Sequence, residues 1–200
     1  GRTHRSRMQP HQGSVTAVQF LATHAAGDAH VLTGGDDHRV VLWRATPASS
    51  ASGAPRETYN TGVLHQRHHG IVAAVCAAAD GDTVLSAGRD ARLVTYALQG
   101  ARVASERRLE HALTAVHEHP HNPHLLLLGQ RHASEPARLL DRRAPQGRRV
   151  VLRHARAVHT ASAYVRPTWS PDGNLVACGS PDPRAYIWDV RRMRNGQSMQ

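Results

Sequence analysis

The chain is poor in aromatic residues and contains no lysine, and both absences narrow its interpretation. Phe, Trp and Tyr together make up 4% of the 200 residues, so Ala, Val and Leu must fill most of the interior. All 25 basic residues are arginines, against 15 acidic residues, which gives a formal net charge of +10. The arginines are scattered rather than gathered in one stripe, so we interpret the excess as compositional; an anionic partner, nucleic acid or acidic protein, is the alternative.

Long apolar runs, helical periodicity and a cysteine framework are also missing. No apolar run approaches the roughly 18–20 residues of a membrane span, and no secretory signal pattern is present. No long stretch repeats apolar residues with a 3.6-residue period, so we expect almost no helix. The two cysteines, Cys76 and Cys178, lie in apolar, strand-like runs. They predict buried free thiols in a reduced, intracellular compartment, cytoplasmic or nuclear.

What the chain does have is a repeated pattern. Its clearest copy runs over residues 11–43 and a second over residues 68–96. A third, weaker copy ends at residues 137–143 (ARLLDRR), and a fourth at residues 174–191. The copies close on one equivalent position, occupied by Trp43, Tyr96, Leu140 and Trp188. Repeats of about 40–45 residues with several short strands each are typical of β-propeller blades.

Local patterns divide the copies into strands and turns. In the first copy, residues 15–20, 31–34 and 40–43 are rich in apolar and β-branched residues and predict three strands. Residues 45–62 are small, polar and Pro-containing, which predicts an extended surface loop. Tight hairpins are expected at Asp80-Gly81 and at residues 172–174, Asp-Gly-Asn. The third copy lacks such a turn, and its Pro136 must lie at a strand edge or in a loop.

Aligning the copies on the closing position brings recurring polar residues into register. The first two copies carry a His, a Ser or Thr, an Asp and an aromatic residue: His11, Thr33, Asp37 and Trp43, then His68, Ser86, Asp90 and Tyr96. This arrangement resembles the WD-repeat (WD40) family, whose blades are held by a His–Ser/Thr–Asp–Trp hydrogen-bond network. The fourth copy keeps Asp182 and Trp188 but has Cys178 in place of the hydroxyl. The third has Ser134 and Leu140 in place of the Asp and the aromatic residue.

These polar sets are interpreted as structural. A buried carboxylate is costly unless it accepts hydrogen bonds. Here the Asp would accept them from the backbone N–H groups of its turn and from the His. The His would in turn meet the Ser or Thr hydroxyl, and the Trp indole N–H would gain a partner. His, Ser and Asp together also suggest a hydrolase triad. The set recurs in each repeat, however, and no strand–Gly-x-Ser-x-Gly–helix context accompanies it. We therefore do not expect the chain to be an enzyme, and we expect it to have no catalytic residue and no cofactor.

The ends of the third and fourth copies carry a sharper motif. Residues 187–191 (IWDVR) and 139–143 (LLDRR) match Trp-Asp-x-Arg, the second with Leu for Trp. This motif and the sequence segments GGDDHRVVLW, HHGIVAAV and LLDRRAP make the chain resemble the WD-repeat substrate receptors of cullin-4 ubiquitin ligases. In that family the arginine faces the ligase adaptor. The resemblance spans residues 11–191 and implies that Arg143 and Arg191, with Asp141 and Asp189 beside them, contact the adaptor.

The implied function is a protein–protein interaction scaffold in protein ubiquitination, a substrate-receptor subunit whose partners are the adaptor and a substrate protein. The alternative is a nucleic-acid- or chromatin-associated WD-repeat scaffold that uses an arginine-rich surface. No membrane partner is expected.

Histidines form two further clusters. His117, His119 and His121 would share one face of a strand and converge on Zn²⁺, with His124 nearby. Pro120 and the Asn-Pro turn at residues 122–123 argue against a regular strand there. We therefore expect exposed loop histidines and no metal site. The second cluster is His65, His68 and His69.

The expected fold is all-β: a partial WD40 β-propeller of about four blades, each a four-stranded antiparallel sheet. Residues 1–10 form a basic flanking arm, and the blades cover about 11–60, 61–108, 109–152 and 153–200. Closed propellers typically contain 4–8 blades. The family resemblance implies seven, the third copy is degenerate, and no strand is indicated after Arg191. We therefore expect a fragment of a seven-bladed propeller, with two open apolar flanks.

Overall fold

The computed structural model describes residues 10–21, 29–48, 56–143, 149–152, 162 and 164–192. This described part is all-β except for one 3-10 turn, η1 (Val190–Arg192), which confirms the expectation of almost no helix. None of its helical residues forms a segment long and apolar enough to cross a membrane.

The strands form four antiparallel sheets, which we call blades 1 to 4, and consecutive strands are neighbours in each. Blade 1 contains β1 (Val15–Leu21), β2 (Ala29–Gly35), β3 (Val40–Ala48) and β4 (Arg56–His65). Blade 2 contains β5 (Val72–Ala77), β6 (Thr83–Gly88), β7 (Arg92–Ala97) and β8 (Arg102–Arg108). Blade 3 contains β9 (Leu113–His119), β10 (Asn122–Gln130), β11 (Ala137–Asp141) and β12 (Arg149–Leu152). Blade 4 contains β13 (Thr168–Trp169), β14 (Leu175–Gly179) and β15 (Ala185–Asp189). The meander of each blade confirms the propeller-type, all-β prediction, although blade 4 has three strands among the described residues where four were expected.

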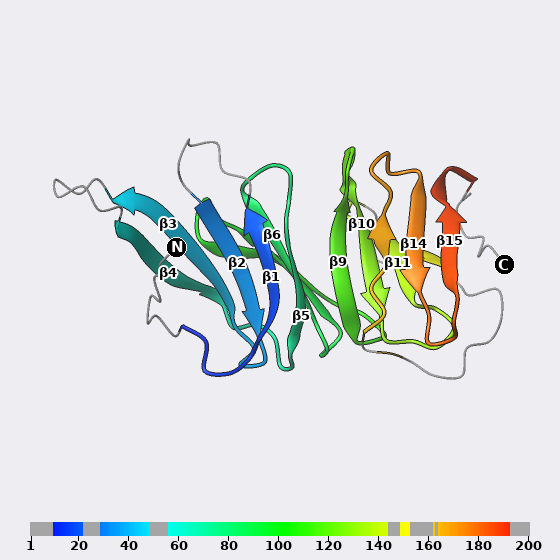
Figure 1. The fold of residues 1–200 in the computed structure, drawn as a ribbon, viewed down its shortest axis with the longest axis horizontal. Coiled ribbons are helices and arrows are strands. Elements are labelled where there is room, and N and C mark those ends of the chain that lie inside the picture. Colours follow the sequence, from blue (N-terminus) through cyan, green and yellow to red (C-terminus); the bar gives the residue numbers. More distant parts are fainter. Residues whose placement is uncertain are drawn as a thin grey trace.

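The blades follow one another in a row, with blade 1 at one end and blade 4 at the other (Figure 1). The innermost strands make the contacts: β1 packs on β5, β5 on β9, and β9 on β13. Three apolar cores fill the spaces between successive blades. Each blade therefore buries its faces only against its neighbours in the row.

Both cysteines are buried in these cores and free. Cys76 belongs to the core between blades 2 and 3, and Cys178 to the core between blades 3 and 4. Burial raises the pKa of the Cys76 thiol to about 11 and that of the Cys178 thiol to about 12. Both are thus protonated at neutral pH and behave as small apolar residues, which confirms the prediction of buried free thiols.

The prediction of a surface loop over residues 45–62 is wrong at both ends of that segment. Strand β3 continues to Ala48 and pairs with β4 from Arg56 onward. Residues 49–55 lie outside the described residues. The missed pattern is RETYNTG at residues 56–62, where Thr and Tyr favour a strand despite the polar composition.

The two predicted Asp-Gly hairpins are confirmed. Gly81 and Gly173 both have φ near +71°, in the left-handed region that glycine enters without steric cost. In the first hairpin, the Asp80 carboxylate accepts hydrogen bonds from the backbone N–H of Asp82 at 2.9 Å and of Thr83 at 2.7 Å. The turn is thereby fixed by its own side chain.

The weakest repeat nevertheless forms a complete four-stranded sheet. In blade 3, Pro136 lies in the loop directly before β11, as expected, and its carbonyl accepts a hydrogen bond from the Gln130 N–H at 2.8 Å. Strand β10 supplies a run of buried leucines, Leu126, Leu127 and Leu128, to the cores on both sides. Apolar alternation therefore suffices to build this blade.

Candidate functional site

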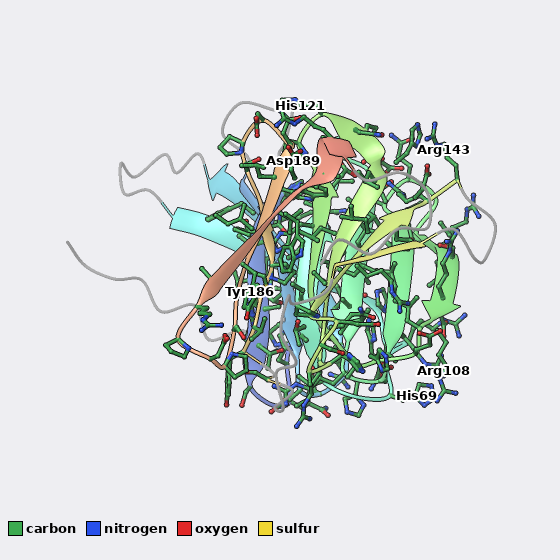
Figure 2. All side chains as sticks on the ribbon, turned by 90° about the vertical axis from the view of Figure 1, so that its right-hand side faces the viewer. His69, Arg108, His121, Arg143, Tyr186 and Asp189 are labelled. Atoms are coloured by element: carbon green, nitrogen blue, oxygen red, sulfur yellow. The ribbon has the colours of Figure 1, made fainter. Side chains whose placement is uncertain are left out.

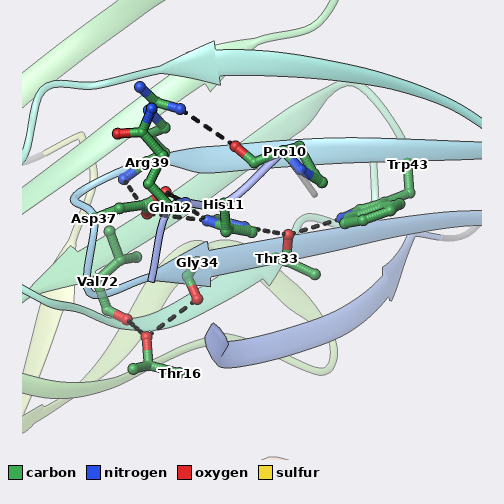
Figure 3. Close-up of polar contacts among 10 residues, drawn as sticks. All are labelled: Pro10, His11, Gln12, Thr16, Thr33, Gly34, Asp37, Arg39, Trp43 and Val72. Carbon is green, nitrogen blue, oxygen red and sulfur yellow. Dashed lines mark hydrogen bonds and ion pairs between the residues drawn. The ribbon is translucent and has the colours of Figure 1, made fainter. Parts of the chain in front are cut away.

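Blade 1 contains the complete four-residue network (Figure 3). The Trp43 indole N–H donates to the Thr33 hydroxyl at 2.8 Å, and that hydroxyl lies 2.8 Å from His11 Nε2. His11 Nδ1 lies 2.9 Å from an Asp37 carboxylate oxygen. A neutral His11 with its proton on Nδ1 satisfies both contacts, because it then donates to Asp37 and accepts from Thr33.

The Asp37 carboxylate is held in its ionised form. It accepts hydrogen bonds from the backbone N–H groups of Gln12 at 2.9 Å and Arg39 at 3.2 Å. Burial alone raises the pKa of Asp37, but the hydrogen bonds from His11 and the two backbone groups outweigh it and lower the pKa. The side chain therefore joins the segment before β1 to the β2–β3 turn.

Blade 2 repeats this geometry with one change. His68 Nε2 lies 2.8 Å from the Ser86 hydroxyl, and His68 Nδ1 lies 3.2 Å from Asp90. The Asp90 carboxylate accepts from the His69 N–H at 2.7 Å, as Asp37 accepts from Gln12. In place of an indole, His65 Nε2 reaches the Ser86 hydroxyl at 3.3 Å.

His65 was missed as a member of this network. It closes β4 of blade 1, is 7% exposed, and its ring centre lies 5.8 Å from that of Tyr96. Burial, followed by the nearby His68 and Arg67, lowers the pKa of His65 to about 4. The His-x-x-His spacing of residues 65 and 68 was visible in the sequence, but nothing there indicated that a residue of the previous blade would enter.

Two glycines are required by this geometry. A Cβ atom at Gly35 would lie 2.4 Å from an Asp37 oxygen and 2.6 Å from His11 Nδ1. A Cβ atom at Gly88 would lie 2.2 Å from an Asp90 oxygen and 2.4 Å from His68 Nδ1. The His–Asp contact thus passes directly over the backbone, and only glycine leaves room for it. Strand pairing puts Gln130 at the equivalent position of blade 3, where no His–Asp pair exists.

Blade 3 replaces the network with leucines. Matching the strand pairings of the blades puts Leu128 at the position of Thr33 and Ser86, and Leu140 at that of Trp43 and Tyr96. Leu128 and Leu140 belong to one buried cluster, against which Leu109 packs. The hydrogen-bonded set of the other blades is therefore exchanged for an apolar one.

Different polar groups lie beside these leucines. Arg138 is 1% exposed and donates to a Glu110 oxygen at 3.1 Å. Among the described residues, one group of three side chains could hold a metal ion: potential ligand atoms of His111, His132 and Glu135 lie within 4.8 Å of one another. His132 Nδ1, however, already accepts the Glu135 N–H at 3.1 Å, so this ring nitrogen is occupied. The cluster was not predicted, and it carries no metal assignment.

Blade 4 keeps only part of the network. The Tyr186 hydroxyl donates to an Asp182 oxygen at 2.9 Å, so a tyrosine serves this carboxylate. Cys178 pairs with Tyr186 across the strands and is buried, as is Trp188. The segment that would supply a histidine, residues 153–161, lies outside the described residues.

His119, one of the three histidines weighed as an alternative zinc set, has other partners in the structure. His119 Nε2 lies 3.1 Å from the Gly173 carbonyl, and its Nδ1 accepts the His121 N–H at 3.0 Å. Both ring nitrogens are therefore used. The His119 ring also meets Trp169 edge-on, with centres 4.7 Å apart. The expectation of an exposed loop histidine is wrong for His119, because β9 extends through it and blade 4 half-buries it.

The two Asp-x-Arg motifs have the same geometry. Arg143 Nε and a terminal nitrogen donate to the two oxygens of Asp141 at 3.1 and 2.9 Å. Arg191 donates in the same way to Asp189 at 3.0 and 2.7 Å. Each aspartate also accepts the backbone N–H of its arginine, at 2.9 Å in blade 3 and 3.0 Å in blade 4. Adjacent blades thus present two rigid, bidentate pairs.

Both arginines remain accessible, with 63% of each side chain exposed. Figure 2 shows Arg143 and Asp189 at one end of the sheets with His121, whereas His69 and Arg108 lie at the other end. We call the first end the arginine rim. The hydrogen bond from the Arg143 side chain is the main cause that lowers the pKa of Asp141 to about 2. The Arg143–Asp141 pair is therefore neutral overall at neutral pH, while most of the arginine side chain stays exposed.

Comparison with known proteins agrees with the fold. Residues 2–44 and 149–189 match the family model described as WD domain, G-beta repeat. A stretch of 84 residues is 32% identical to the human (Homo sapiens) Echinoderm microtubule-associated protein-like 3. The match covers 38% of this chain and 9% of that protein. The β-propeller domain of Myceliophteria thermophila Cps50 (Swd1) superposes with a TM-score of 0.65 at 21% identity.

The superposition covers 90% of this chain and 53% of the solved domain, so the chain spans about half of that propeller. At this identity the likeness concerns the fold alone, and it does not separate the cullin-4 receptors from other propellers. The blade topology, the recurring hydrogen-bond sets and the superposition show a WD40-type β-propeller fold, and two stretches of the chain match the WD-repeat family model.

Proposed function

We propose that this chain is a protein-interaction scaffold that serves as a substrate-receptor subunit of a cullin-4 ubiquitin ligase, with Arg143 and Arg191 in contact with the ligase adaptor. The observation that carries the proposal is the duplicated geometry: two exposed arginines, each locked by its own aspartate, on adjacent blades. Repeats otherwise conserve positions that hold a blade together. Both arginine side chains are 63% exposed and are held by an aspartate of their own blade, so packing between blades does not account for them.

The locked geometry favours binding. An arginine already held in one rotamer loses less conformational entropy when a partner binds it. Because the aspartate uses one edge of the guanidinium, the remaining N–H groups suit carbonyl or carboxylate oxygens on a protein surface. The surplus positive charge of the chain also favours encounter with an acidic partner.

The test is a binding titration with the purified cullin-4 adaptor. The double variant Arg143→Ala/Arg191→Ala is expected to weaken adaptor binding by at least about tenfold, which corresponds to about 1.4 kcal/mol. The matched control is Arg89→Ala/Arg108→Ala, which removes the same charge from two exposed positions. Arg108 lies at the opposite end of the sheets from the arginine rim (Figure 2). The Arg89 N–H bonds to the Ile71 carbonyl, two residues after His69, which lies at that same opposite end. Equal affinities for the two double variants would show that the arginine rim does not carry adaptor binding.

The net charge of +10 supports a second candidate, a nucleic-acid-associated scaffold. Its signature is a steep fall in affinity for duplex DNA or RNA as salt rises from about 50 to 200 mM. In that case both double variants lose affinity alike, since phosphate contacts by scattered arginines are interchangeable.

A further inference from the structure

Two arginines occupy the same position in neighbouring blades, in the turn between the second and third strands. Each directly follows the last residue of its strand, β6 in blade 2 and β10 in blade 3. The Arg89 N–H donates to the Ile71 carbonyl at 2.9 Å, and the Arg131 N–H donates to the Ala112 carbonyl at 2.8 Å. Both side chains are exposed, so neither belongs to a blade core.

A third exposed arginine lies on the segment that joins the two blades. Arg108 ends β8, and the N–H of the next residue, Leu109, donates to the Ala91 carbonyl in the turn that carries Arg89, at 2.8 Å. Three residues further on, the same segment accepts the Arg131 N–H. The segment therefore runs from one turn to the other along the boundary between blades 2 and 3. We call Arg89, Arg108 and Arg131 the boundary arginines.

The acidic side chains within a few residues of the boundary arginines each lie against a basic group of their own. The pairs, in chain order, are Asp90 with His68, Glu106 with Arg92, Glu110 with Arg138, and Glu135 with His111 and His132. The boundary arginines, in contrast, form no ion pair with any residue that the structure describes. Their positive charge is therefore left for a partner.

Blade 1 has the opposite charge at the equivalent position. Its Asp36 N–H donates to the Ser14 carbonyl at 3.0 Å, as the Arg89 and Arg131 N–H groups do in their own blades. The backbone geometry of the turn thus does not require an arginine. The positive charge is particular to the boundary of blades 2 and 3, and both sheets at this boundary have four strands in the structure.

The turns that carry the arginines are held by hydrogen bonds of their own. In blade 2, the Asp90 carboxylate accepts the backbone N–H of His69 at 2.7 Å and that of Arg92 at 3.2 Å. In blade 3, the Glu135 N–H donates to His132 Nδ1 at 3.1 Å. The guanidinium groups therefore project from fixed backbone, which reduces the conformational entropy lost when a partner binds.

We propose that the boundary arginines bind a short segment of a partner protein that is rich in Asp and Glu. In a substrate receptor this partner is the substrate, a step that rests on the proposed function. Guanidinium groups bind carboxylates through parallel, charge-assisted hydrogen bonds. Figure 2 shows Arg108 and His69 at the end of the sheets opposite Arg143, so the acidic segment and the adaptor occupy opposite ends.

The residue types around the boundary arginines favour an acidic protein segment over single-stranded nucleic acid. Proteins hold single strands largely by stacking bases on aromatic rings. No Phe, Trp or Tyr stands within four residues of any boundary arginine in the sequence. Carboxylate recognition needs no such ring.

The test is a fluorescence-anisotropy titration of the chain with labelled peptides that differ only in charge. One peptide carries glutamates in a Gly-Ser frame, and the other carries glutamines at the same places. The wild type is expected to bind the Glu peptide at least about tenfold more tightly, and Arg89→Ala/Arg131→Ala should lose at least about tenfold of that affinity. The matched control, Arg44→Ala/Arg102→Ala, removes the same charge from exposed strand positions and should keep it.

Charge reversal separates binding from folding. Arg89→Glu/Arg131→Glu should lose the Glu peptide and gain affinity for a Lys peptide of the same frame, which a misfolded variant cannot do. Equal affinity for the Glu and Gln peptides, equal losses in the two alanine double variants, or a reversed variant that binds neither charged peptide would each overturn the proposal.

Duplex DNA is the remaining competitor in the same assay. If it binds more tightly than the Glu peptide, and if that binding is lost in Arg89→Ala/Arg131→Ala, the surface belongs to nucleic acid and the proposal is wrong. The titrations contain no adaptor, so their outcome does not depend on whether the arginine rim binds one.

Discussion

At the scale of single residues, the Thr33 hydroxyl is the centre of the blade 1 network, because it joins the Trp43 indole to His11. Thr33→Val keeps the β-branched shape and removes both hydrogen bonds. The Trp43 indole N–H and the His11 Nε2 atom then lack a partner. The free energy of unfolding should therefore fall by about 2 kcal/mol in urea titrations. Thr95→Val is the control at a strand position where the structure gives the threonine hydroxyl no such bond, and no comparable loss is expected there. Equal losses in the two variants would contradict the network account.

His65 gives the protein a predictable dependence on pH. Its folded pKa of about 4 lies below the ordinary value of 6.5, so the unfolded chain binds more protons between these values. The stability from neutral His65 is complete above pH 6.5 and is lost as the pH falls toward 4. Lowering the pH from 7.5 to 5 should cost about 2 kcal/mol of unfolding free energy through this group.

The measurement compares urea unfolding of the wild type and His65→Gln at pH 7.5 and pH 5. The variant should lose about 2 kcal/mol less on acidification, because glutamine does not titrate. His68, whose burial also lowers its pKa, leaves some dependence in both proteins. If His65→Gln lost as much unfolding free energy between pH 7.5 and pH 5 as the wild type, His65 would not be the source of the pH dependence.

The sequence predicts the residues of each network better than the departures from it. Aligned copies brought His11, Thr33, Asp37 and Trp43 together, because those partners recur at nearly constant spacing. His65 escaped, because it enters blade 2 from the last strand of blade 1, and a contact between repeats has no fixed spacing within a repeat. Leu128 escaped as well, although Leu140 was placed correctly, because a longer β10–β11 loop shifts the count back from Leu140.

At the scale of strands and turns, blade 3 shows that the polar network is not needed to form a blade. Its four strands pair along their lengths with Leu128 and Leu140 in the network positions. Replacing hydrogen-bonded polar groups on all sides by apolar groups of similar size is nearly neutral in free energy, whereas removing one partner is not. This is the physical reason why a repeat can lose the whole polar set at once and still form a blade.

The β13–β14 turn holds blades 3 and 4 together through Gly173. This residue has φ near +71°, and a Cβ there would lie 2.3 Å from the His119 ring. Gly173→Ala should therefore lower the free energy of unfolding by about 1–3 kcal/mol, since it adds backbone strain to a steric clash. Gly62→Ala is the control, because a Cβ at Gly62 meets nothing within 4 Å. Thermal or urea unfolding of both variants checks the difference, and a stable Gly173→Ala protein would contradict the role of this turn.

At the scale of the whole molecule, apolar periodicity predicted the blades and their order but could not predict which flank is covered. Val18 and Val75 are the same residue type at the same repeat position, yet one is 64% exposed and the other 6%. The difference comes only from the neighbouring blade. Likewise, the motif at residues 139–143 and 187–191 suggested the arginines, but the identical locking of both by aspartate required coordinates.

If the blade networks hold the fold while the arginine rim carries the proposed adaptor binding, one paired measurement separates the two roles. Adaptor affinity and urea unfolding are measured on two proteins, Asp37→Asn and Arg143→Ala/Arg191→Ala. The account predicts that Asp37→Asn loses about 1–2 kcal/mol of stability at unchanged affinity. The double arginine variant should lose at least about tenfold in affinity at unchanged stability. Unchanged adaptor affinity in the double arginine variant, or an affinity that merely follows stability in both proteins, would contradict the account.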